Sequence, residues 1–196
     1  MMLLSDCHCQ STFIDTSHRS FVIQTVHTMR KKWLRGKFLL MTLILLCACS
    51  PRFNWREFHS NEAPYTILMP GKPSSLSKDV QLGGLNLTMH MDAVEVSDLN
   101  FAVGSVKLND PGQAWLVREA MKAGLINNIH GHITKDSHMP DAVIEISGKA
   151  RDGSTLNMAV RLIIQGPRVY QILVLGPESR LQPEIVETFM TSFHAN

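Results

Sequence analysis

Three histidines near the middle of the chain have residue types and spacing suited to metal binding. His130 and His132 stand two residues apart, so in an extended segment their side chains point to the same side of the backbone. Asp136 or His138 would then complete a Zn or Cu site. Paired histidines in polar loops are also commonly solvated surface residues, which leaves both interpretations open. The metal-site hypothesis therefore consists of His130, His132 and His138.

Three arginines form a second candidate, a face for an anionic partner. Arg151, Arg161 and Arg168 lie on successive predicted strands or in their turns. Gathered on one face of a sheet, they would attract a lipid head group, a glycan or an acidic protein surface. An ordinary solvated face, with Glu145 and Asp152 as neighbours, is the alternative.

The sequence patterns of common enzymes are missing. The chain has no Gly-x-Ser-x-Gly elbow to present a nucleophile and no glycine-rich phosphate loop. Met89-His90-Met91 has residue types that bind copper, but neighbours in a strand face opposite sides, so these methionines are predicted to fill the core. We expect a non-catalytic protein without a cofactor. A hydrolase whose site residues are dispersed in the sequence is the alternative.

Candidate residues of this kind must be positioned by strands and two helices. Apolar runs separated by turn residues predict strands at 65–69, 78–82, 85–96, 99–108, 132–137 with 141–150, 156–165 and 168–175. Asp110-Pro111 opens a helix that reaches about residue 129, and Pro183 starts a closing helix. In the strand at 85–96, apolar residues alternate with Asn86, Thr88, His90 and Asp92, which predicts one core face and one solvated face.

Hairpin links without β-α-β alternation predict an α+β fold, an antiparallel sheet with both helices packed on it. Between residues 65 and 193 this order, together with a first strand that ends in Met69-Pro70-Gly71-Lys72-Pro73, resembles the PsbP-like family, whose fold is an α/β/α sandwich. The resemblance implies a single domain, placed at residues 64–196. It also implies an accessory or assembly-factor role rather than an enzyme.

Residues 29–48 have the layout of a secretory signal peptide. A run of basic residues precedes the apolar segment 38–48, which is too short for a stable membrane span of about 20 residues. The segment ends in Leu46-Cys47-Ala48-Cys49, which resembles the lipobox of bacterial lipoproteins. That resemblance implies cleavage before Cys49 and transfer of a diacylglycerol to its sulfur. A buried helix ending in two cysteines is the alternative.

The lipobox divides the chain and suggests a location. Residues 1–28 do not fit the signal and are expected to be an over-extended, unstructured start, whereas residues 49–63 form a tether. Ser50 stands where an Asp is the usual inner-membrane retention signal, which implies the inner leaflet of the outer membrane, facing the periplasm. We expect a lipid-anchored binding or assembly module of the cell envelope with an envelope protein as partner. A periplasmic metal- or small-ligand-binding protein that uses His130, His132 and His138 is the alternative.

The net charge and the cysteine content of the mature chain differ from those of the full sequence if residues 1–48 are removed. The 196 residues include 19 Lys+Arg and 17 Asp+Glu, for a net charge of +2. Six of the basic and two of the acidic residues lie in 1–48, so 13 and 15 remain in residues 49–196. This mildly acidic balance does not favour a nucleic-acid partner. Once Cys49 is acylated, the mature chain has no free thiol, and no pattern indicates its oligomeric state.

Overall fold

Two antiparallel sheets are built from the strands of the chain. The computed structural model describes residues 52–137, 139 and 141–196. A seven-stranded sheet has the order β3-β4-β5-β9-β8-β7-β6, and a three-stranded sheet has the order β1-β2-β10. The strands are β1 Arg56–His59, β2 Tyr65–Met69, β3 Ser74–Leu82, β4 Leu85–Val96, β5 Leu99–Lys107, β6 His132–Lys135, β7 Ile144–Lys149, β8 Thr155–Gln165, β9 Arg168–Gly176 and β10 His194–Ala195.

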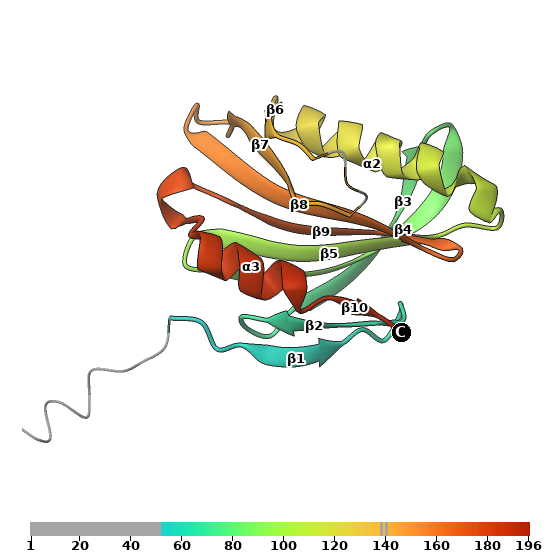
Figure 1. The fold of residues 1–196 in the computed structure, drawn as a ribbon, viewed down its shortest axis with the longest axis horizontal. Coiled ribbons are helices and arrows are strands. Elements are labelled where there is room, and N and C mark those ends of the chain that lie inside the picture. Colours follow the sequence, from blue (N-terminus) through green and yellow to red (C-terminus); the bar gives the residue numbers. More distant parts are fainter. Residues whose placement is uncertain (1–51, 138, 140) are drawn as a thin grey trace, which may run out of the picture. The chain divides into compact units, whose positions relative to one another are not determined.

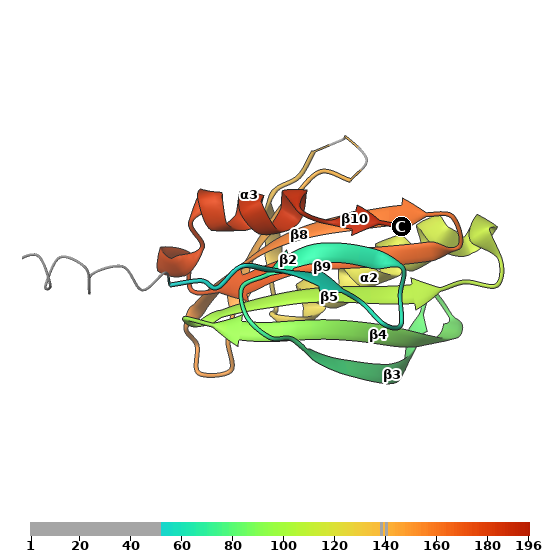
Figure 2. The same cartoon turned by 90° about the horizontal axis from the view of Figure 1, so that it is seen from below.

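The helices lie on opposite faces of the seven-stranded sheet. Helix α2, Ala114–Asn128, covers one face, whereas helix α3, Pro183–Thr191, and the three-stranded sheet cover the other (Figures 1 and 2). The sheet therefore has a hydrophobic core on each side. Val117 and Met121 of α2 belong to the first core, and Phe189 of α3, Tyr65 and Phe101 belong to the second.

The α+β class and the antiparallel pairing agree with the sequence analysis, but the expectation of one sheet does not. Strand β2 pairs with β1 and β10 instead of joining the large sheet. Strand β1 comes from the segment expected to be a tether, and its register runs from Arg56 opposite Met69 to His59 opposite Thr66. The second sheet is therefore assembled from short segments at both ends of the described chain.

Element bounds follow local chemistry in most places. The strands at 65–69 and 85–96 have the predicted bounds, whereas β3 begins at Ser74 because β4 offers it partners as far as Ala93. The predicted helix start is a 3₁₀ turn, η1 Pro111–Gln113, in which Asp110 accepts a hydrogen bond of 2.9 Å from the backbone N–H of Gly112. Strand β6 ends at Lys135 beside a register shift, and β7 begins only at Ile144.

The β3–β4 hairpin illustrates how turn residues set the register. Gly83 and Gly84 have φ angles of +59° and +80°, values that a two-residue hairpin turn requires and that glycine adopts without strain. Within the described part of the chain, no helix combines the length and the apolar composition of a membrane span.

Candidate functional site

The histidine cluster proposed from the sequence is only partly within the described residues. His130 is exposed in the turn after α2, with a φ of 46°, and His132 is the exposed first residue of β6. His138 lies outside the described residues, as do Cys49 and the lipobox. Among the residues that the structure describes, no three His, Cys, Asp or Glu side chains are grouped closely enough to hold a metal ion.

The structure does not bring the three arginines together. Arg151 is in the turn before β8 and Arg168 opens β9 just after β8 ends, so the two stand at opposite ends of an 11-residue strand, roughly 33 Å apart. Arg161, in the middle of β8, donates 2.9 Å and 3.0 Å hydrogen bonds to the carbonyl oxygens of Asp141 and Met190. Arg161 therefore ties the end of α3 to the sheet.

Asp92 is the centre of a buried polar cluster that the sequence analysis expected to be solvated. Its side chain is 1% exposed, and Tyr65 of β2 and Ser60, which follows β1, contact it. Its carboxylate accepts hydrogen bonds from the hydroxyls of Ser60, Tyr65 and Ser75, the first at 2.9 Å. Burial and the bond to Asp92 raise the pKa of Tyr65 well above its usual value. The cluster joins the two sheets.

The same cluster contains residue types that hydrolases use, in an unproductive arrangement. The Ser77 hydroxyl lies 2.7 Å from Nδ1 of His90, but Nε2 of His90 is 3.8 Å from the Asp92 carboxylate, beyond hydrogen-bond distance. A catalytic triad needs its base oriented by a hydrogen bond to the acid. Three hydroxyls instead donate hydrogen bonds to the Asp92 oxygens. This arrangement favours a structural role for Ser77, His90 and Asp92.

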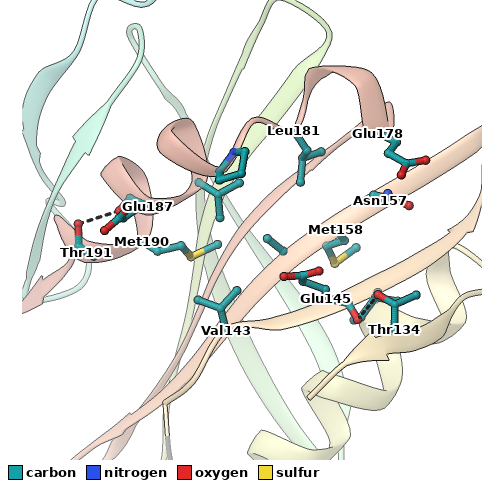
Figure 3. A pocket seen from close by; sticks show the side chains of 14 residues that line it. Thr134, Val143, Glu145, Asn157, Met158, Glu178, Leu181, Glu187, Met190 and Thr191 are labelled. Carbon is teal, nitrogen blue, oxygen red and sulfur yellow. Dashed lines mark hydrogen bonds between the residues drawn. The ribbon is translucent and has the colours of Figure 1, made fainter. Parts of the chain in front are cut away.

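A cavity lies between α3 and the strands β6 to β8, and we call it the α3 groove (Figure 3). It has a volume of about 500 Å³. Helix α3 supplies one wall with residues spaced three and four apart, which places them on one side of the helix. These residues are Pro183, Val186, Glu187, Met190 and Thr191.

Strands β6 to β8 supply the opposite wall of the α3 groove. Glu145 of β7 and Ala159 of β8 are direct partners in the register, so both side chains face the α3 side of the sheet. Val143, which precedes β7, and Asn157 of β8 extend this wall along the strands. At one end, the groove is closed by Leu181 and by Glu178 of the 3₁₀ turn η2, Glu178–Arg180.

Polar groups in the α3 groove are mainly acceptors. The carboxylates of Glu145, Glu178 and Glu187 border it, and Oδ1 of Asn157 is buried without a hydrogen-bond partner. The hydroxyls of Thr134 and Thr191 already donate to the backbone oxygens of Glu145 and Glu187, at 3.1 Å and 2.7 Å. The groove thus combines apolar walls with negative charge at its border.

A second hollow on the α2 side is more apolar. It has a volume of about 580 Å³ and lies between α2 and the strands β3, β4, β5 and β9. Met89 and Met91 line it, and His90 faces the other side of β4, as the strand alternation predicts. Both methionines pack against the core of the α2 side, which agrees with their predicted role as core residues.

The residues of the α3 groove were not identified from the sequence. Glu145, Asn157, Glu178 and Glu187 belong to four different elements and form no motif. The closing helix did carry a partial signal, because Val186 extends its apolar surface beyond the side that Ile185, Phe189 and Met190 bury. A helix with an apolar surface wider than its contact with the sheet leaves part of that surface to another contact.

Similarity to known proteins is low. No family model matches the chain, and no curated protein matches it. A crystal structure of a protein from Bacteroides thetaiotaomicron VPI-5482 is similar with a TM-score of 0.43 and 13% sequence identity. The match covers 72% of this chain and 48% of that chain, so the present chain spans about half the length of that protein.

Proposed function

We propose that this chain is a bacterial envelope lipoprotein whose α+β domain, of the PsbP-like type, is a non-catalytic binding module. The α3 groove is the binding site in this proposal. The observation that carries it is the groove itself, a cavity of about 500 Å³ with apolar walls and a few polar groups at its border. Ligand sites in proteins commonly have this size and composition.

The chemistry of the groove supports binding rather than turnover. Val186, Leu181 and Val143 offer apolar contact, and Glu187 and Glu145 offer hydrogen-bond acceptors from opposite walls. Such groups fix the orientation of a bound molecule and give it selectivity. Because α3 is held to the sheet by Arg161 and by the packing of Phe189 on Phe101, with ring centroids 5.2 Å apart, the two walls keep their spacing.

The membrane anchor and location are part of the same proposal. The basic run and the apolar segment before Cys49 support export and acylation, and Ser50 supports the inner leaflet of the outer membrane. A domain tethered there faces the periplasm, where it meets other envelope proteins. Several acyl chains together hold a protein stably at a membrane.

Site-specific cross-linking in cells tests the binding site. A benzophenone-bearing residue at Thr191, which is exposed and lines the groove, is compared with one at Asn86, exposed at the far end of the β3–β4 hairpin. We expect a discrete adduct from position 191 only, and its loss when Val186→Trp fills the groove. Equal adducts from both positions, or an adduct that Val186→Trp leaves unchanged, would contradict the proposal.

A further inference from the structure

Hydrogen-bonding capacity in the α3 groove is unbalanced toward acceptors. Glu178 and Glu187 have no Lys, Arg or His side chain within ion-pair distance among the described residues. Glu145 pairs with Lys135 at 3.1 Å, but Lys135 is 71% exposed, so water screens that pair strongly. Oδ1 of Asn157 is also buried and unpartnered. A bound molecule that carries hydrogen-bond donors and positive charge would therefore complement this lining.

The nearby arginines do not meet this need. Arg161 directs its donors to the backbone oxygens of Asp141 and Met190, and Arg180 lies 3.7 Å from Asp98 on another loop. The negative charge at the border of the groove is therefore left for an external cation.

The length of the groove favours a chain segment over a small amine. Its α3 wall runs from Pro183 to Thr191, which is nine helical residues or about 13 Å. An extended peptide covers that distance with about four residues. Glu178 and Leu181 stand before the start of α3, whereas Glu187 is its middle residue, so carboxylates recur along the groove.

We propose that the α3 groove binds a basic segment of an envelope protein, in which Lys or Arg residues alternate with apolar ones. Long basic side chains place their aliphatic stems on apolar surface and keep their charged ends at polar groups. Val186 and Val143 would contact the stems, and Glu187 and Glu145 would receive the charged ends. The inference rests on the proposed function, because it names the partner chemistry of the same site.

Peptide binding to the full purified chain tests the partner chemistry. The probes are labelled peptides of equal length with alternating Lys and Leu, Glu and Leu, or Ser and Leu. We expect the Lys-Leu peptide to bind most tightly and to weaken with added salt. The double variant Glu145→Gln, Glu187→Gln should bind it about five- to tenfold more weakly.

A matched control separates this effect from a general loss of charge. Glu95→Gln removes an exposed carboxylate from β4, three strands from β8 in the sheet, and should leave binding unchanged. Circular dichroism of each variant confirms folding. Glu187→Lys provides a charge-reversal test. It should weaken binding of the Lys-Leu peptide and strengthen binding of the Glu-Leu peptide.

The outcomes distinguish the inference from the proposed function. If Val186→Trp abolishes binding of all three peptides and their affinities are equal, the cationic preference is wrong while the groove remains the site. If no peptide binds and position 191 gives no adduct in cells, the groove assignment fails as well. Equal weakening of the Lys-Leu peptide by Glu95→Gln would also overturn the inference, because general charge would then explain the binding.

Discussion

At the scale of single residues, Asp92 is distinguished by a carboxylate that is almost fully buried. Three hydroxyls from Ser60, Tyr65 and Ser75 donate to one carboxylate that is 1% exposed. Bonds to an ionised acceptor in a buried site contribute more than ordinary hydrogen bonds, and a donor left unpaired there costs free energy. The contact between the two sheets therefore depends on this carboxylate.

Asp92→Asn should lower the free energy of unfolding by about 2 kcal/mol, because the amide replaces one of two acceptor oxygens with a donor. Asp79→Asn is the matched control, since Asp79 is exposed and accepts a single hydrogen bond from Thr88 at 2.9 Å. We expect the control to lose at most about 0.5 kcal/mol. Urea unfolding measures both variants, and equal losses would contradict the role given to Asp92.

Tyr65 makes the stability of the domain depend on alkaline pH. The pKa of Tyr65 is raised above its ordinary value of 10.0, first by burial and then by the bond to Asp92, so the folded state holds the phenolic proton more tightly than the unfolded chain. The stabilisation is complete below about pH 10 and is lost as pH rises further.

Tyr65→Phe should therefore unfold more easily at neutral pH but lose less stability between pH 9 and pH 12 than the unsubstituted chain. The neutral-pH loss is about 1 kcal/mol for the missing hydrogen bond. Burial raises the pKa of Tyr170 too, so part of the alkaline decline persists in the variant. Urea midpoints measured across this pH range test the prediction, and parallel pH profiles for the two proteins would contradict it.

At the scale of elements, alternation and turn residues predicted what local sequence determines. The bounds of β2 and β4 follow from Pro70, Gly83 and Gly84, and Asp110 caps the turn that starts the first described helix. Strands β1 and β10 were missed because they are short, and β10 in addition pairs only after the C-terminal segment meets β2. That omission also explains why His90 and Asp92 were expected on a solvated face.

The candidate site was less predictable than the fold, for a related reason. The walls of the α3 groove join because β7 and β8 pair, and because Phe189 holds α3 on the sheet. Neither the pairing of β7 with β8 nor the packing of α3 produces a recognisable sequence motif around Glu145 or Asn157. The arginines were expected on one face of the sheet, but the structure separates them. Arg151 and Arg168 stand at opposite ends of β8, which is 11 residues long.

Substitution of Arg161 tests whether its hydrogen bonds hold α3 on the sheet. Arg161→Met keeps the aliphatic length but removes the donors to Asp141 and Met190, so we expect a loss of about 1–3 kcal/mol and faster hydrogen exchange in α3. Arg151→Met, in an exposed turn, is the control and should change stability by less than about 0.5 kcal/mol. If exchange in α3 is unchanged in Arg161→Met, the helix is held by packing alone.

At the scale of the whole molecule, the proposed anchor and the proposed groove have separate chemical causes. The anchor depends on one thiol at Cys49, whereas the groove depends on the packing of α3 on β7 and β8. A change in one should leave the other intact. Substitutions at Cys49 can therefore test membrane attachment without disturbing the binding surface.

Cys49→Ala should move the protein from the membrane fraction to the soluble periplasmic fraction, because alanine has no sulfur to carry the diacylglycerol. Cys47→Ala is the matched control: it removes the neighbouring thiol but keeps a small residue two positions before the cleavage site, so the protein should stay with the membrane after a salt wash. Metabolic labelling with a radioactive fatty acid should mark the chain and the control, and spare Cys49→Ala. Retention of Cys49→Ala in washed membranes, or labelling lost only in Cys47→Ala, would refute acylation at Cys49. Loss of the anchor with an unchanged affinity for the Lys-Leu peptide would show that tether and binding site act independently.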